Sequence, residues 1–128
     1  MKISGLHHVA IIAADYPRSR RFYVDVLGLE VVSENYREAR DSWKLDLRVD
    51  ATTQIELFSF PAPPARVSRP EAAGLRHLAF RVDDIEAAVA HLARHEVACE
   101  AIRIDEYTGK RFTFFADPDD LPLELYEA

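Results

Sequence analysis

The chain repeats a pair of short apolar segments, and this repeat limits the possible folds more than any other feature. Leu6–Ile11 near the start resembles Leu75–Phe80, and Ile55–Phe58 in the middle resembles Leu123–Tyr126 at the end. Each segment is rich in apolar and β-branched residues, as strands are. Repetition on this scale indicates two copies of one supersecondary unit.

Each copy opens with a histidine and closes with a glutamate. From His8 to Glu56 is 48 positions (56 − 8), and from His77 to Glu124 is 47 (124 − 77). Imidazole nitrogen and carboxylate oxygen together suit divalent transition metals. The repeated pair therefore predicts a metal site built from all four side chains.

Apolar periodicity and turn residues predict an α+β fold of two tandem βαβββ modules that form a curved mixed sheet within a single domain of 1–128. Module one covers about 5–60, a proline-rich linker covers 61–74, and module two covers about 75–128. The expected strands are 6–12, 29–36, 43–49, 54–60, 75–82, 98–104, 111–116 and 121–127. One helix starts at Asp15 and ends at Gly28, and the other covers 84–95, with Asp83 and Glu86 as a capping box.

Strand parity separates the apolar residues from the candidate ligands, because side chains alternate between faces along a strand. The apolar positions of the strands that carry Ile11, Leu57 and Leu125 should pack under the helices. The four candidate ligands, His8, Glu56, His77 and Glu124, then lie on the opposite faces. His7 shares its parity with the apolar set and is disfavoured as a ligand.

Composition excludes several classes of function. The net charge of −6 and the pI of about 5.3 disfavour a nucleic-acid partner. Cys99 is the only cysteine, which favours a reducing compartment, and no apolar stretch reaches the roughly 20 residues that span a bilayer. We therefore expect a cytoplasmic protein without membrane or nucleic-acid partners.

These residues resemble the vicinal oxygen chelate superfamily, which contains glyoxalase I, epimerases, fosfomycin-resistance enzymes and extradiol dioxygenases. The resemblance covers nearly the whole chain. Some segments are similar to the YaeR-type branch of short bacterial glyoxalase-I-like proteins. The matching segments are His8–Ile11, Phe22–Tyr23, Leu27–Gly28, Tyr36–Lys44, Ile55–Pro61, Lys110–Phe115, Asp117–Pro118 and Leu123–Leu125.

The resemblance implies a metal-dependent lyase or isomerase of the glyoxalase I (lactoylglutathione lyase) type. One divalent metal (Ni, Zn, Co, Mn or Fe) would stabilise an enediolate-type intermediate of a small, anionic, oxygenated substrate, with glutathione hemithioacetal as the leading candidate. By position, Glu124 inherits the role of catalytic base, with Glu56 as its counterpart. The resemblance also implies a homodimer, and leaves open whether one chain or two supply the four ligands.

Two other functions remain open. The first is another enzyme of the superfamily: an epimerase, a dioxygenase or a thiol transferase. The second is a non-catalytic small-molecule binding or resistance protein. Glu56 favours the lyase, because the resemblance implies glutamine at this position in most epimerases.

Cationic and aromatic residues suggest a rim that binds an anionic substrate. Solvated charge balanced by Glu34, Glu38 and Asp41 is the alternative interpretation. We interpret His91 and His95 as an exposed helix end and Cys99 as a buried, inert thiol. The rim residues are Arg37, Arg40, Trp43, Lys44, Lys110 and Arg111.

Overall fold

A computed structural model describes all 128 residues and divides the chain into two compact units. Unit 1 is Met1–Ala65 and unit 2 is Arg66–Ala128. Each unit contains a four-stranded mixed sheet and a helix, which confirms the α+β prediction. None of the helices is long and apolar enough to cross a bilayer.

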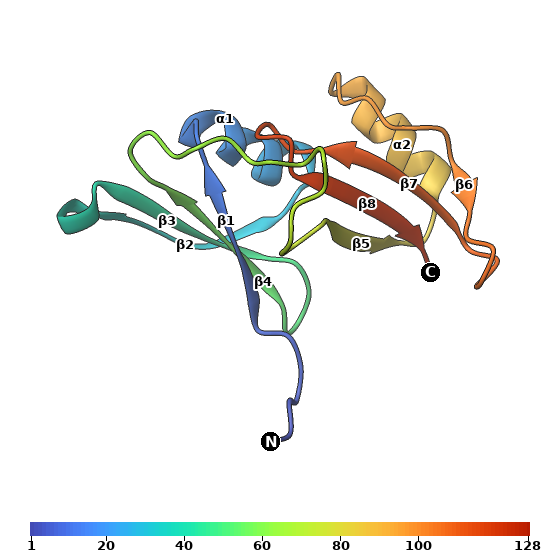
Figure 1. The fold of residues 1–128 in the computed structure, drawn as a ribbon, viewed down its shortest axis with the longest axis horizontal. Coiled ribbons are helices and arrows are strands. Elements are labelled where there is room, and N and C mark those ends of the chain that lie inside the picture. The colour runs from blue at the N-terminus through green and yellow to red at the C-terminus, as the bar shows by residue number, and fades with distance from the viewer. The chain divides into compact units, whose positions relative to one another are not determined.

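Unit 1 begins with β1, whose partner β4 is the last strand of the unit. The sheet order is β1-β4-β3-β2, with β1 parallel to β4 and the other pairs antiparallel (Figure 1). The elements are β1 (His8–Ala13), α1 (Tyr16–Arg21), a π-helical turn (Phe22–Val26), β2 (Glu30–Arg37), a 3-10 turn (Glu38–Arg40), β3 (Ser42–Arg48) and β4 (Gln54–Ser59).

Unit 2 repeats this topology with the order β5-β8-β7-β6 and a parallel β5–β8 pair. The two βαβββ modules predicted from the sequence are therefore confirmed, and 61–74 contains neither helix nor strand. The elements are β5 (Leu78–Val82), α2 (Ile85–Arg94), β6 (Arg103–Ile104), β7 (Arg111–Ala116) and β8 (Pro122–Glu127).

Helix starts follow the expected capping chemistry, with one correction. The Asp15 carboxylate accepts a hydrogen bond from the Arg18 amide, as an N-cap does. In α2 the cap is Asp84, which accepts from the Ala87 amide, so the predicted capping box at Asp83 was wrong. A capping side chain bonds the amide three residues further along the chain. The amide bonded here is that of Ala87, so the cap is Asp84, whereas Asp83 would have bonded the amide of Glu86.

Two other elements differ from the prediction. The strand expected over 98–104 is reduced to β6. The residues before β6 do not form a continuous ladder with β7, and the Glu100 amide bonds the Phe114 carbonyl at 2.8 Å as an isolated hydrogen bond. The first helix changes to π-type hydrogen bonding, in which the Leu27 amide bonds the Phe22 carbonyl at 2.9 Å. Gly28 then ends it at φ +74°.

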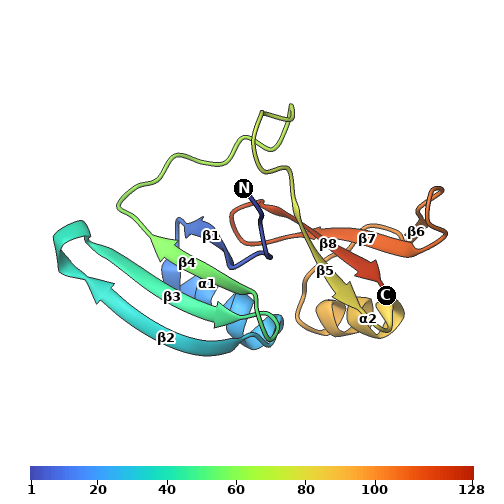
Figure 2. The same ribbon diagram turned by 90° about the horizontal axis from the view of Figure 1, so that it is seen from below.

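The cores confirm the parity prediction. Figure 2 shows α1 on one face of the first sheet and α2 on one face of the second. We call the opposite face of each sheet its open face. The residues that pack beneath the helices include Ile11, Leu45, Leu47, Ile55 and Leu57 in unit 1 and Phe115, Leu123 and Leu125 in unit 2.

A charged hydrogen-bond network attaches α1 to β2. Glu34 accepts hydrogen bonds from the Tyr16 hydroxyl and from Arg20 Nε, the latter at 2.8 Å. The bonds from Arg20, and then from Tyr16, lower the pKa of Glu34 below its ordinary value of 4.5. Their contribution to stability is therefore complete above that value, and is lost as the pH falls through the lower pKa of the folded state.

We expect Glu34→Gln to lower the free energy of unfolding at neutral pH by about 1–2 kcal/mol, since it removes charge-assisted hydrogen bonds. Urea denaturation measures the change. The difference in the free energy of unfolding between the variant and the wild type should become smaller at acidic pH. Glu30→Gln is the matched control, because Glu30 is exposed and pairs with Arg48 at 3.3 Å; it should cost less than about 0.5 kcal/mol. Equal losses in both variants would contradict this role for Glu34.

Candidate functional site

The first histidine–glutamate pair lies on the open face of unit 1. His8 begins the edge strand β1, and Glu56 lies on its neighbour β4. His8 Nε2 is 3.5 Å from Glu56 Oε2, and the Glu56 side chain is 16% exposed. On the other side of the ring, His8 Nδ1 is 2.9 Å from Nδ1 of the exposed His7. The parallel pairing of β1 with β4 thus brings the two predicted ligands into contact.

Two charged residues of β3 surround Glu56. Lys44 Nζ lies 3.3 Å from Glu56 Oε1 and 2.6 Å from Asp46 Oδ1, and Asp46 stands opposite Glu56 in the strand register. The hydrogen bond with Asp46 raises the pKa of Lys44. Burial raises the pKa of Asp46, but hydrogen bonds from Lys44 and Ser33 outweigh it and leave this pKa lowered. A permanent cation therefore stands beside Glu56.

The second pair lies on the open face of unit 2. His77 lies one residue before β5 rather than on it, and Glu124 lies on the neighbouring β8. His77 Nε2 is 3.0 Å from Glu124 Oε2, and the Glu124 side chain is only 11% exposed. His77 Nδ1 is buried and has no hydrogen-bond partner. The second pair thus repeats the contact of the first, with the histidine one residue before its strand in unit 2 and at the start of its strand in unit 1.

The cross-strand neighbours of the two carboxylates differ. Asp46 stands opposite Glu56, whereas Phe114 stands opposite Glu124. The Phe114 ring also packs edge-on against His77, with centroids 5.1 Å apart. Glu56 therefore has charged neighbours across the strand, whereas the neighbours of Glu124 are an imidazole and an aromatic ring.

The chemistry of the two pairs fits a divalent metal. Neutral imidazole and carboxylate are common ligands of such ions. In both pairs the histidine presents Nε2 to a carboxylate oxygen of its glutamate, and these are the two donor atoms that one ion would bind. Each unit supplies two of the four predicted ligands, and no group of three or more His, Cys, Asp or Glu side chains suited to a metal occurs in the structure. The complete four-residue site stays a prediction.

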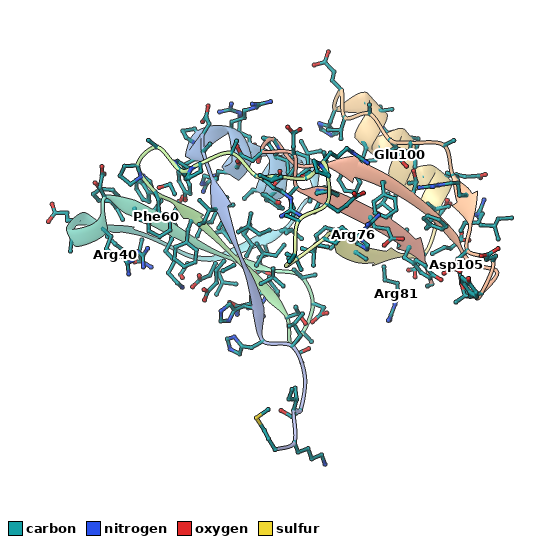
Figure 3. All side chains as sticks on the ribbon, in the orientation of Figure 1. Arg40, Phe60, Arg76, Arg81, Glu100 and Asp105 are labelled. Carbon is teal, nitrogen blue, oxygen red and sulfur yellow. The ribbon has the colours of Figure 1, made fainter.

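Three of the predicted rim residues share the open face of unit 1. Arg37 lies opposite Ser42, and Lys44 lies opposite Phe58, on the side that carries Glu56. Arg40 belongs to the same cluster, because its guanidinium lies 5.7 Å from the centroid of the Phe60 ring. Figure 3 labels Arg40 and Phe60 beside one another.

The other three predicted rim residues have partners other than Glu56 and Glu124. They are Trp43, Lys110 and Arg111. Trp43 lies on the helix side, stacked on Tyr16 with centroids 5.4 Å apart. Arg111 has the parity of the buried face of β7 and pairs with Glu127 at 2.6 Å, and with Glu86 of α2 at 3.1 Å. Lys110 Nζ donates to the carbonyl of the last residue at 2.7 Å. The position of Trp43 was predictable from the sequence. Trp43 and Lys44 are adjacent residues of one strand, so their side chains point to opposite faces of the sheet.

A cavity of about 1010 Å³ in unit 2 adjoins the second pair. Its lining includes His77, Cys99, Arg103 and Phe114. Burial raises the pKa of the Cys99 thiol, in agreement with an inert rather than a nucleophilic cysteine. The sequence patterns above did not predict Asp46, Phe114 or Arg103 as site residues. Asp46 could have been found, because it follows Lys44 by two residues and therefore shares its face of the strand.

Comparisons with known proteins identify the family of the chain. The sequence model of the Glyoxalase/Bleomycin resistance protein/Dioxygenase superfamily matches residues 5–125. The chain belongs to this superfamily. YaeR of Escherichia coli K12 is 69% identical over 98% of this chain and 97% of its own. YwkD of Bacillus subtilis 168 is 58% identical over 99% of both. A glyoxalase family protein from Enterococcus faecalis has a TM-score of 0.91 and 48% identity, covering 99% of this chain and all of its own.

Two more distant relatives of this superfamily member have described activities. A 2-epi-5-epi-valiolone epimerase from Actinomyces is 32% identical over 94% of this chain and 78% of its own. The trypanothione-dependent glyoxalase I of Leishmania major has a TM-score of 0.74 and 26% identity, covering 98% of this chain and 87% of its own. The superfamily thus includes both isomerising and epimerising enzymes.

Proposed function

We propose that this chain is a metal-dependent lyase or isomerase of the glyoxalase I type, acting on a small oxygenated substrate. The main support is the recurrence of one histidine–glutamate contact, at 3.5 Å in unit 1 and 3.0 Å in unit 2, at equivalent places in the two units. The two pairs together supply two nitrogen and two oxygen donors, a set that suits one divalent ion.

His8, Glu56, His77 and Glu124 would hold the divalent metal, whichever of Ni, Zn, Co, Mn or Fe it is. When bound, the metal acts as a Lewis acid that polarises adjacent substrate oxygens. Polarisation of a carbonyl makes the neighbouring carbon–hydrogen bond acidic, so the protein must then supply a base that moves a proton from one carbon to the next.

Glu124 is the proposed base of the two carboxylates, because its contacts leave it free of an ammonium group. Lys44 offsets the negative charge of Glu56 at 3.3 Å, whereas the ion-pair contact of Glu124 is with His77, and its cross-strand neighbour is Phe114. The adjoining cavity of about 1010 Å³ has the capacity for a small-molecule substrate.

Elemental analysis of the purified protein, followed by turnover of glutathione hemithioacetal with each candidate metal, tests this proposal. We expect about one metal per chain, because the two pairs share an ion whether they belong to one chain or to two subunits of a homodimer. We expect turnover with at least one of the metals. Protein that contains no metal and has no affinity for Ni²⁺ or Zn²⁺ would favour a non-catalytic binding protein instead.

An epimerase is the second candidate, because a relative at 32% identity has that described activity. It would use the same transfer of a proton next to a carbonyl, and would differ in returning the proton to the same carbon. Incubation in D₂O separates the two: an epimerase inverts and deuterates one centre of its substrate, whereas a glyoxalase produces the isomerised thioester.

A further inference from the structure

Two arginines on the open face of unit 1 have no carboxylate partner. Arg37 and Arg40 form no ion pair, although the chain carries more acidic than basic residues. Among the carboxylates nearby in sequence, Glu34 bonds Arg20, Asp41 accepts a hydrogen bond from Tyr36 at 2.5 Å, and the exposed Glu38 forms no ion pair with either arginine. The neighbouring acids of β2 and the turn after it therefore leave both guanidinium groups without a counter-charge.

Aromatic rings hold these guanidinium groups in place. Arg37 lies over the Phe58 ring at 4.8 Å and 5.8 Å from Phe60, and Arg40 lies 5.7 Å from Phe60. The Arg37 Nη2 atom donates to Ser42 Oγ at 2.9 Å. Stacked and anchored in this way, an arginine loses less conformational entropy when it binds an anion.

Arg37 also carries an unsatisfied donor. Its Nε atom is buried and has no hydrogen-bond partner. A guanidinium binds a carboxylate or a phosphate through two parallel hydrogen bonds, and the Nη donors of Arg37 and of the exposed Arg40, unlike the enclosed Nε, are placed to supply them.

The pair of arginines continues the open face from the His8–Glu56 contact. Phe58 follows Glu56 by two residues and shares its face, and Lys44 contacts Glu56 while lying 6.0 Å from the Phe58 ring centroid. The order along this face is thus carboxylate, ammonium, ring and guanidinium. A substrate whose oxygens lie at Glu56 would reach the guanidinium groups with a group at its other end.

We propose that Arg37 and Arg40 bind a terminal oxyanion, a carboxylate or a phosphate, of the substrate of this site. This inference rests on the function proposed above for the His8–Glu56 pair. Lys44 is excluded from the role because Asp46 and Glu56 already neutralise it. The arginines position the substrate and take no part in the proton transfer.

Nuclear magnetic resonance of ¹⁵N-labelled, EDTA-treated protein tests the proposal, with the arginine Nε–Hε signals as the readout. Sodium glutarate and inorganic phosphate are the two probes, and uncharged glutaramide is the control ligand. We expect saturable shifts of the Arg37 and Arg40 signals with an anionic probe and none with glutaramide. The tighter of the two probes identifies a carboxylate or a phosphate as the natural group.

Variants separate this site from general attraction to positive charge. Arg37→Gln and Arg40→Gln should each weaken binding of the better probe about ten-fold or more, and Arg37→Lys, which keeps the charge, should also weaken it. Arg48→Gln is the matched control, since Arg48 has the same face parity but pairs with Glu30, and should change binding less than about two-fold.

Absence of a saturable shift in the wild type, or equal weakening by Arg37→Gln and Arg48→Gln, would overturn the proposal. Because these measurements use neither metal nor turnover, they are independent of the lyase assignment. Saturable binding without any hemithioacetal turnover would remove only the lyase. Turnover without anion binding at Arg37 would remove only this inference.

Discussion

Replacement of Glu124 by glutamine is expected to lower kcat by about 10²–10⁴-fold while the protein still binds its metal, because the amide keeps an oxygen ligand but accepts no proton. The Glu124 side chain is 11% exposed and lies between His77 and Phe114, without a permanent cation. Turnover of glutathione hemithioacetal, with metal content determined on the same preparation, measures both properties together.

Glu56→Gln is the matched variant, since it makes the same change at the equivalent position of unit 1. Lys44 Nζ lies 3.3 Å from Glu56 Oε1 and occupies this carboxylate, so we expect a clearly smaller loss of kcat than in Glu124→Gln. Unimpaired turnover by metal-loaded Glu124→Gln would remove the proposed base. Equal losses in the two variants would show that the carboxylates share the role.

His77→Ala is expected to weaken metal binding by on the order of 100-fold or more, because even residues that only support metal ligands contribute 10–100-fold. His8→Ala should have a comparable effect, although the two histidines belong to different units. Competition with a chromogenic chelator measures the affinity, and elemental analysis measures the stoichiometry.

His95→Ala is the control, because His95 lies at the end of α2 with its ring 4.7 Å from His91. We expect unchanged metal affinity, which would also argue against a separate site at this helix end. Two metals per chain, with each histidine variant losing only one of them, would indicate two independent pairs and contradict a shared centre.

Much of the fold was predictable because it depends on local patterns. The alternation of residues such as Ile55 and Leu57 places them under a helix, and the repeat predicts that unit 2 follows unit 1. The errors lie where a local pattern has two solutions. Asp83 and Asp84 are both capable of capping α2, and only the path of the chain selects Asp84.

The candidate site was also predictable in part. Strand parity and the repeat place one histidine and one glutamate on the open face of each sheet, because a strand's alternation is a property of the backbone alone. The neighbours of each carboxylate are set by register between strands: Lys44 and Asp46 beside Glu56, but Phe114 beside Glu124. That register is a long-range property, and so is the contact of Glu34 with Arg20 of α1. The sequence by itself therefore determined the tandem modules and the type of ligand, whereas the tertiary structure decided which carboxylate is left without a permanent cation and which arginines are left without a counter-charge.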